Sequence, residues 1–374
     1  EFRSTTKSDI KPPLKNIELL SRSAGKSEVR TLVKRAEIIA EQVHCIRDFV
    51  NAPANHLNPE IFATKFKKLA TASGLKAEIF TDSQLKSQGF GGITSVGQGS
   101  ASKPRLLHVT YTPKNVSKNG SKTKKSKRIA LVGKGITFDT GGYALKPREG
   151  MVTMKCDMSG AATVVAAAIA IAQLKLPIEV HAWAALAENM VSDTATRPSD
   201  VISMYGGKTV EVLNPDAEGR LVLGDALVKA AEVGEKLGGL DGIVDVATLT
   251  GAQSIALGTR TAAVMTNNER FQEVFLNAVK LSGELFWPMP LPEELRPSLD
   301  SPVADIANIG DRMGGMLVAG LFLKEFVEPQ LPWLHLDIAG PAFNSGKEYG
   351  YTPEGGTGMS LASLVTLAEE LLDS

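Results

Sequence analysis

Four carboxylates stand out because each lies in an apolar, glycine-rich segment: Asp139, Asp157, Asp216 and Glu218. The first two belong to residues 132–158, which include Gly-Lys-Gly-Ile-Thr-Phe-Asp-Thr-Gly-Gly, and the others to residues 214–220, Asn-Pro-Asp-Ala-Glu-Gly-Arg. Burying four negative charges without compensation would cost much free energy. Two divalent cations would neutralise them, and paired cations about 3.5–4 Å apart are a common arrangement for hydrolysis. Oxygen ligands of this kind favour Mg²⁺, Mn²⁺ or Zn²⁺ over copper or an iron–sulfur cluster.

Other interpretations of these segments explain fewer residues. A phosphate-binding loop would suit a glycine-rich turn after a strand, but the spacing G-x-x-x-x-G-K-[ST] is absent and two acids would repel phosphate. In the second segment, Asp216 could cap a helix whose first turn holds Glu218. That interpretation leaves Arg220 at the wrong end of the helix, and Gly219 inside it at roughly 1 kcal/mol relative to Ala. A third segment, residues 247–252, is by itself an ordinary turn after a strand.

The remaining composition excludes several classes of protein. Lys+Arg and Asp+Glu balance at 41 each, which gives no reason to expect nucleic acid or a membrane as partner. The five histidines lack metal-site spacing, and Cys45 and Cys156 alone cannot make a disulfide scaffold and fit a reducing compartment. Residues 114–128 hold six Lys and one Arg without an acid. They are either a patch for an anionic partner or, as we favour in the absence of aromatic residues, a solvated loop.

The acidic segments follow predicted strands. Apolar β-rich runs predict strands over residues 106–111, 129–136, 178–184, 210–213, 242–248, 262–266 and 334–338. Helical periods predict helices over residues 27–50, 160–175, 217–237, 268–282, 312–327 and 359–372, and one more after Asn58-Pro59-Glu60. The alternation predicts an α/β fold with a largely buried mixed sheet flanked by helices, whose ligands lie at the carboxyl ends of strands. The most apolar stretch, residues 161–174, is shorter than the roughly 20 residues that cross a bilayer, so we expect a buried helix.

Taken together, the segments resemble the leucine aminopeptidase (cytosol aminopeptidase) family of dinuclear metallo-exopeptidases. The family pattern N-T-D-A-E-G-R-L corresponds to residues 214–221, and G-K-G-x-T-F-D-[ST]-G-G corresponds to residues 133–142. Further agreement is found at residues 47–51, 154–158, 188–189, 248–251, 305–308 and 335–340. The resemblance covers roughly residues 40–374. One departure is Pro215, which stands where the family has Thr and removes a backbone N–H beside Asp216.

The resemblance implies a role for each site residue. Asp139 and Glu218 would bridge two divalent cations, which the resemblance implies to be zinc, manganese or magnesium. The tighter cation site would be completed by Lys134, as a neutral amine, and Asp157, and the more exchangeable one by Asp216. The catalytic residues would be Lys146, beside the scissile carbonyl, and Arg220, which would hold a bicarbonate ion as general base with the backbone amides of Gly219 and Leu249. The pocket for the first side chain of the substrate would be lined by Met154, Thr248 and Gly251.

The resulting prediction is a metal-dependent aminopeptidase that removes N-terminal leucine or other apolar residues from peptides. The resemblance implies a homohexamer and a cytoplasmic location. Residues 1–26 are predicted to be a linker remnant after a missing N-terminal domain, and residues 27–374 the catalytic metallopeptidase domain. Because the chain opens on Glu1 without a charged-then-apolar leader, we expect that an upstream segment has been removed. The alternatives are a binding protein whose metal affinity is weakened by Pro215, and a dipeptidase with the same chemistry.

Overall fold

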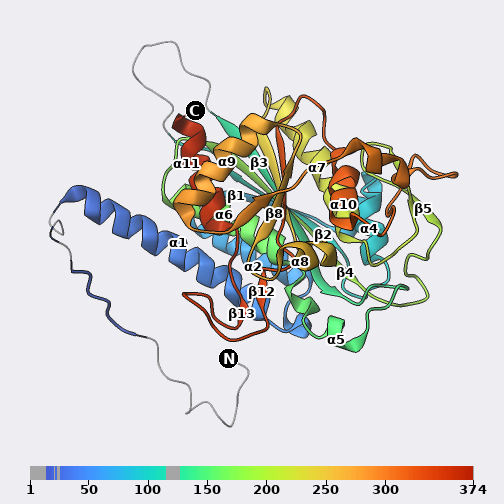
Figure 1. Ribbon diagram of the computed structural model, residues 1–374, viewed down its shortest axis with the longest axis horizontal. Coiled ribbons are helices and arrows are strands. Elements are labelled where there is room, and N and C mark those ends of the chain that lie inside the picture. Colours follow the sequence, from blue (N-terminus) through green and yellow to red (C-terminus); the bar gives the residue numbers. More distant parts are fainter. Residues whose placement is uncertain (1–13, 21, 23–25, 115–126, 374) are drawn as a thin grey trace, which may run out of the picture.

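A mixed eight-stranded sheet crosses the molecule in the order β1-β2-β4-β3-β7-β11-β8-β9 (Figure 1). The computed structural model describes residues 14–20, 22, 26–114 and 127–373. The strands of this sheet are β1 Lys76–Phe80, β2 Arg105–Tyr111, β3 Arg128–Asp139, β4 Glu179–Asn189, β7 Gly242–Ala247, β8 Ala262–Thr266, β9 Phe286–Pro288 and β11 Trp333–Asp337. The central strands β4, β3, β7 and β11 run parallel to one another, with antiparallel neighbours β2 and β8 on either side. The carboxyl ends of four adjacent strands therefore meet at one edge.

Helices cover both faces of this sheet (Figure 1). One face packs against α1 Ser27–Asn51, α2 Pro59–Ala72, α6 Ser159–Gln173, α9 Glu269–Ser282 and α11 Leu361–Asp373. The other face packs against α3 Asp82–Ser87, α4 Gly91–Gly97, α7 Gly219–Lys236 and α10 Gly315–Lys324. The central strands are buried on both sides, which explains why they read as continuous apolar runs and not as alternating ones.

Helix α6 is the most deeply buried helix segment on the first face. It is alanine-rich, and every residue from Ser159 to Ala172 is buried. Among the described residues, the segment Arg148–Gln173 that contains it is long and apolar enough to cross a membrane, yet 89% of its most apolar window is buried inside the protein. Its close approach to the sheet depends on Gly160, where an added Cβ would lie 2.0 Å from the carbonyl oxygen of Val246. The helix is therefore part of the core, as predicted.

Shorter elements complete the described part of the chain. The strands β10 Ile306–Ala307, β6 Thr209–Val212 and β5 Asp200–Ser203 form a small sheet in that order, and β12 Phe343–Asn344 pairs with β13 Gly355–Gly356. The remaining helices are α5 Arg148–Met151 and α8 Gly251–Leu257, with the single-turn or 3₁₀ elements η2 Ala54–His56, η3 Met154–Cys156 and η4 Glu293–Leu299. The loops after β3, β7 and β6 and the element η3 carry the residues of interest.

The predicted fold class is confirmed, and the seven predicted strands and the predicted helices are present. Strand β4 is longer than expected and reaches Asn189, while α10 is shorter because it begins only after Gly314, which is left-handed at φ +70°. The sequence missed the short edge strands β1 and β9 and the short helices α3, α4 and α8. Most of residues 1–26 and of the basic run 114–128 lies outside the described residues. Arg128 itself begins β3 and pairs with Glu179 at 2.9 Å.

Candidate metal centre

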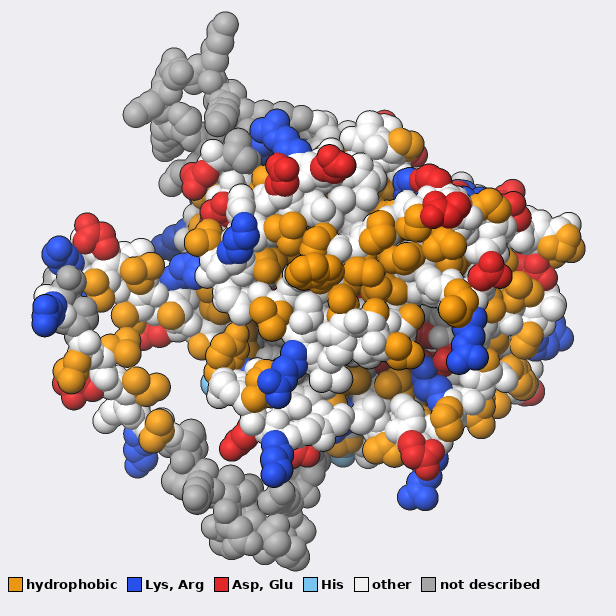
Figure 2. Space-filling view, in the orientation of Figure 1, with side chains coloured by type: hydrophobic (Ala, Val, Ile, Leu, Met, Phe, Trp, Pro, Cys, Tyr) orange, Lys and Arg blue, Asp and Glu red, His pale blue; other side chains and the backbone are white. Residues whose placement is uncertain are grey.

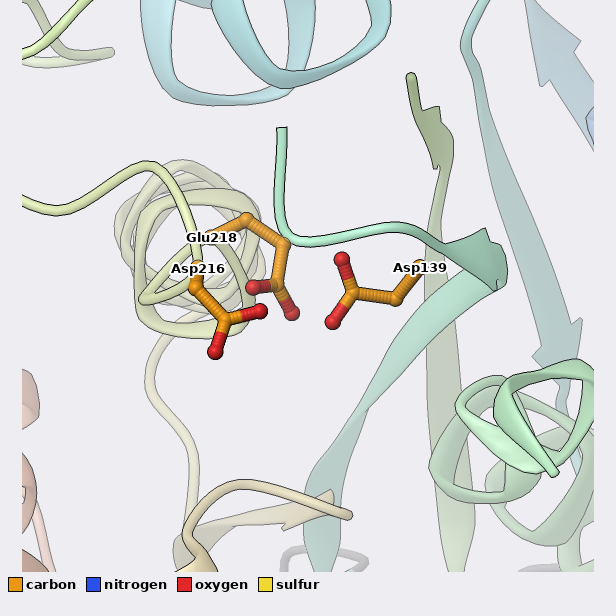
Figure 3. A group of neighbouring side chains, drawn as sticks. All are labelled: Asp139, Asp216 and Glu218. Atoms are coloured by element: carbon orange, nitrogen blue, oxygen red, sulfur yellow. The ribbon is translucent and has the colours of Figure 1, made fainter. Parts of the chain in front are cut away.

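Three of the predicted carboxylates converge at the carboxyl edge of the sheet (Figure 3). Asp139 is the last residue of β3, and Asp216 and Glu218 lie in the loop between β6 and α7. Ligand oxygens of these three residues all lie within 4.8 Å of one another. Asp139 and Glu218 are each 2% exposed, so the cluster is built into the protein and is not a solvated acidic surface.

Lys134 connects this cluster to the fourth carboxylate. It lies on β3, five residues before Asp139, and its side chain is 4% exposed. Its Nζ lies 2.9 Å from Oδ1 of Asp157 and 2.8 Å from Oε1 of Glu218, and it donates a hydrogen bond of 2.8 Å to the carbonyl oxygen of Thr248. The Thr248 hydroxyl donates to Oδ1 of Asp157 at 2.7 Å. The five residues predicted as metal ligands are thus brought together.

Lys146 faces the same cluster from its more open side. Its Nζ lies 2.9 Å from Oδ2 of Asp139 and 2.6 Å from Oδ1 of Asp216. A tight turn returns the chain to the cluster, closed by a hydrogen bond of 2.9 Å from the Lys146 amide to the carbonyl oxygen of Thr140. This turn requires glycine at Gly141, whose φ is +86° and where an added Cβ would lie 2.5 Å from a backbone oxygen.

The electrostatics of the cluster favour an additional cation. Burial raises the pKa of Glu218, and the charge of Asp139 raises it further. Burial likewise raises the pKa of Asp157, against the opposing charge of Lys134. Oδ2 of Asp157 and Oε2 of Glu218 are buried and have no hydrogen-bond partner within the described part of the chain. Buried carboxylate oxygens without partners are costly, and a divalent cation would satisfy them. The donor set therefore fits a divalent metal.

The charge state of Lys134 depends on that cation. Burial alone would lower its pKa, but the charges of Asp157, Glu218 and Asp139 raise the pKa above its ordinary value. Lys134 is thus an ammonium group in this arrangement. The neutral amine that a metal ligand requires would form only with a cation in place of these ion pairs.

Arg220 lies beside the carboxylates on the first turn of α7. Its side chain is 7% exposed, its Nη1 donates to the carbonyl oxygen of Asn308 at 2.8 Å, and its guanidinium lies 5.8 Å from the Phe322 ring centroid. Burial lowers its pKa to about 10, while the charges of Glu218 and Asp337 oppose that shift. Its Nε has no partner among the described residues. A buried cation with an unused donor is suited to holding an anion.

The glycine before Arg220 has a steric explanation that the sequence did not reveal. Helix α7 begins at Gly219, so the expected cost of a glycine inside a helix does not arise, and Glu218 rather than Asp216 occupies the N-cap position. An added Cβ at Gly219 would lie 2.6 Å from Cδ and Cε of Lys134. Because Gly219 has no Cβ, the Lys134 side chain can occupy the space next to it. The interpretation of Asp216 as a helix cap was wrong.

The residues predicted to line a substrate pocket differ in their surroundings. Gly251 is exposed, and nothing lies within 4 Å of where its Cβ would stand. Met154 is half-buried in η3. Thr248, in contrast, directs both its hydroxyl and its carbonyl oxygen into the carboxylate cluster. The Leu249 amide, expected to help hold an anion, donates to Oδ1 of Asp337 at 3.1 Å.

Two asparagines that sequence reasoning left without a role lie next to the cluster. Asn189, at the end of β4, donates to Oδ1 of Asp139 at 2.8 Å and to the carbonyl oxygen of Pro215 at 3.1 Å. Asn308, just after β10, contacts the loop that carries Asp216. Both fall in segments that support the family resemblance, which was the available signal for them.

Comparisons with known proteins identify the family of this chain. The model of the cytosol aminopeptidase family, catalytic domain, matches residues 44–365. A probable cytosol aminopeptidase of Streptomyces avermitilis is 53% identical over 359 residues, which are 96% of this chain and 67% of that protein. One from Leifsonia xyli is 49% identical over 380 residues, covering 99% of this chain and 73% of that protein. The solved structure of the bottromycin maturation enzyme BotP in complex with Mn is 41% identical with a TM-score of 0.86, over 92% of this chain and 73% of that one. The chain belongs to the cytosol aminopeptidase family, whose members are metal-dependent hydrolases.

Proposed function

We propose that this protein removes N-terminal residues, preferably leucine or other apolar ones, from peptides with the help of two divalent cations. The observation that carries the proposal is the convergence of three buried carboxylates and the half-buried Asp216 with Lys134, together with the unpartnered oxygens of Asp157 and Glu218. Four negative charges match two doubly positive ions. We propose residues 27–374 as the catalytic unit, acting in the cytoplasm as a homohexamer.

Within this proposal the five ligands divide between two cation sites. Asp139 and Glu218 serve both cations, Lys134 and Asp157 the tighter one, and Asp216 the more exchangeable one. When bound, the cations polarise the peptide carbonyl and lower the pKa of water. Zinc and manganese are the proposed ions, and the manganese complex of the similar enzyme BotP supports the second.

Lys146 and Arg220 supply the proposed catalytic groups. The Lys146 ammonium is held at the open side of the cluster by Asp139 and Asp216, where it can stabilise negative charge developing on the carbonyl oxygen. Arg220, with its unused Nε, would hold a bicarbonate ion together with the Gly219 amide, and that ion would supply the general base. The Leu249 amide donates a hydrogen bond to Asp337. It can therefore help to hold the bicarbonate only if it donates to both acceptors.

Substrate selection follows from the groups around the opening of the site. The proposed lining for the first side chain of the peptide is Met154, Thr248 and Gly251. Met154 is half-buried, and the space next to Gly251 is open. The free α-amine of the substrate is recognised at the metal centre, which restricts cleavage to the N-terminal residue.

The decisive experiment is hydrolysis of a panel of amino-acid anilides after dialysis against a chelator. Activity should vanish and return with Mn²⁺ or Zn²⁺, with more turnover for Mn²⁺, and Leu-anilide should exceed acidic and basic analogues. Acetyl-Leu-anilide should not be cleaved. Full activity in the metal-free protein would overturn the two-metal proposal, cleavage of the acetylated substrate would indicate an endopeptidase, and activity confined to dipeptides would indicate the dipeptidase.

A further inference from the structure

The geometry points to Asn308 as the residue that positions the metal-binding loop between β6 and α7, and with it Arg220. This inference rests on the proposed metal function of Asp216 and Glu218. Asn308 is 0% exposed and lies one residue beyond β10, which pairs in parallel with β6. Its own amide continues that pairing by donating to the carbonyl oxygen of Glu211 at 2.9 Å.

The side chain of Asn308 binds both kinds of backbone group in the loop. Its Oδ1 accepts hydrogen bonds from the amides of Leu213, at 2.9 Å, and Asn214, at 3.1 Å. Its Nδ2 donates to the carbonyl oxygens of Asn214, at 2.7 Å, and Ala217, at 3.4 Å. A flipped amide would place two donors against two N–H groups, so the orientation is determined by the loop itself.

Within the loop itself, the Ala217 amide donates to the Asn214 carbonyl oxygen at 3.0 Å. Pro215 has no N–H to donate, and the amide of Asp216 bonds back to the Asn214 side chain at 2.9 Å. The Pro215 carbonyl oxygen accepts a hydrogen bond from the Asn189 side chain at 3.1 Å. Asn308 therefore holds the loop on either side of Asp216, and Asn189 holds its middle. Both carboxylates of the loop, Asp216 and Glu218, depend on this scaffold for their separation from Asp139.

The main chain of Asn308 also positions Arg220. Its carbonyl oxygen accepts the hydrogen bond of 2.8 Å from Arg220 Nη1, which leaves Nε free. One residue thus sets the position of two proposed metal ligands through its side chain and of the proposed anion-holding cation through its backbone. It is a positioning residue, since nothing places it in contact with substrate or metal.

Asn267 offers a matched control. Its side chain also accepts from one backbone amide, that of Trp333 at 2.9 Å, and donates to one carbonyl oxygen, that of Leu331 at 3.0 Å. These contacts lie at the start of β11, the end of the strand away from the carboxylates. Loss of either asparagine removes hydrogen bonds to the backbone, but only Asn308 acts on the metal loop.

The test is direct titration of the metal-free proteins with Mn²⁺, with free Mn²⁺ counted by electron paramagnetic resonance. Asn308→Ala should bind Mn²⁺ about 10–100-fold more weakly than the wild type, as for other residues that orient metal ligands. Asn267→Ala should bind Mn²⁺ with wild-type affinity. Thermal unfolding in chelator should nevertheless show that Asn267→Ala is also less stable than the wild type. Should Asn308→Ala fail to fold, the nearly isosteric Asn308→Asp, which keeps the acceptor and loses the donor, should show the weakening.

The outcomes separate this inference from the function on which it rests. Wild-type affinity in the folded Asn308 variants would overturn the positioning role, because a purely structural residue lowers stability without changing Mn²⁺ binding. Equal weakening in Asn267→Ala would overturn it as well, since the effect would then reflect general destabilisation. A wild-type protein that binds no Mn²⁺ or Zn²⁺ would instead overturn the proposed metal function.

Discussion

Helix α7 carries two buried carboxylates, Glu218 at its N-cap and Asp225 two turns further along, and they differ in their partners. Asp225 is 0% exposed, and its two oxygens accept from the backbone amides of Tyr205, at 2.7 Å, and Ile93, at 2.8 Å. Glu218 is nearly as buried, but one oxygen contacts Lys134 and the other has no partner among the described residues. Burial of an acid therefore does not identify a site. The difference lies in whether backbone donors have already satisfied it.

The largest expected effect is the difference in metal binding between alanine substitutions of these two residues. Glu218→Ala should abolish binding of both metals and all measurable activity, because it removes a ligand shared by the two cations. Asp225→Ala should keep the metal stoichiometry of the folded protein but lower the free energy of unfolding by at least about 1–3 kcal/mol, because the buried Ile93 amide loses its partner and the part-buried Tyr205 amide loses one as well. Elemental analysis and urea unfolding in chelator measure the two properties. Two ions per chain in Glu218→Ala would contradict the assignment.

The next effect concerns the two cationic side chains at the site that do not bind metal in the proposed scheme. Lys146→Ala and Arg220→Ala should retain both metals, change KM modestly and lower kcat by about 10²–10³ and about 10²–10⁴, respectively. Added bicarbonate should raise the wild-type rate in carbonate-depleted buffer and leave Arg220→Ala unresponsive. Steady-state kinetics with metal analysis tests both. A bicarbonate response of wild-type size in Arg220→Ala would exclude its role as anion holder.

A smaller effect compares two glycines at the site. Gly219→Ala should weaken Mn²⁺ binding about 10-fold, because its Cβ would lie 2.6 Å from the Lys134 side chain and displace that amine. Gly251→Ala should leave Mn²⁺ affinity unchanged and alter only the preference among substrate side chains, since its Cβ would face open space. The same Mn²⁺ titration and the anilide panel distinguish them. Unchanged affinity in Gly219→Ala would mean that Lys134 is not a ligand.

The smallest effect is on stability and comes from a region that has no part in the proposed chemistry. His108 stacks on Trp183 with ring centroids 3.6 Å apart, and burial, with the neighbouring charges of His181 and Lys229, lowers its pKa to about 3. Below pH 6.5, the ordinary pKa of histidine, His108 takes up a proton in the unfolded chain but not in the folded protein. The contribution of this group to stability is therefore complete above pH 6.5 and is lost as the pH falls. This group alone should cost about 1 kcal/mol at pH 5.5.

Urea unfolding in chelator at pH 7.5 and 5.5 checks this linkage. His108→Phe keeps an aromatic ring against Trp183 and should lose that part of the pH dependence. An identical pH dependence in wild type and variant would show that His108 is not the titrating group.

Much of the site could be predicted because its residues follow buried strands. The apolar run ending at Asp139 and the glycines around it indicated both a strand and a turn. The structure brings Asp139, Asp216 and Glu218 together at one edge, with Asp157 joined to them through Lys134. The interpretation of Asp216 as a helix cap and of Gly219 as a glycine inside a helix was wrong, because it was based only on the local helix. The reason for Gly219 is Lys134, a residue 85 positions away whose path past the helix no local pattern shows.

The parts that could not be predicted depend on contacts between distant segments. Asn308 contacts a loop more than 90 residues earlier in the chain. Asp337, which lies on another strand, accepts a hydrogen bond from the Leu249 amide. The edge strands β1 and β9 are half-exposed and short, so the apolar runs that revealed the central strands are absent from them. Pro215 appeared to remove a needed donor, but the loop is held by the two asparagine side chains instead.

The direction of β3 has a practical consequence for engineering this enzyme. The strand begins at Arg128 and delivers Asp139 to the opposite edge of the sheet, roughly 35 Å away at about 3.3 Å per residue. Strand β2 ends at Tyr111 on the same remote edge as Arg128, because it runs antiparallel to β4, which is parallel to β3. Tyr111 and Arg128 therefore both lie at the edge of the sheet away from the metal centre. A fluorophore or affinity tag attached next to either strand end would be joined to the protein at the edge opposite the carboxylates.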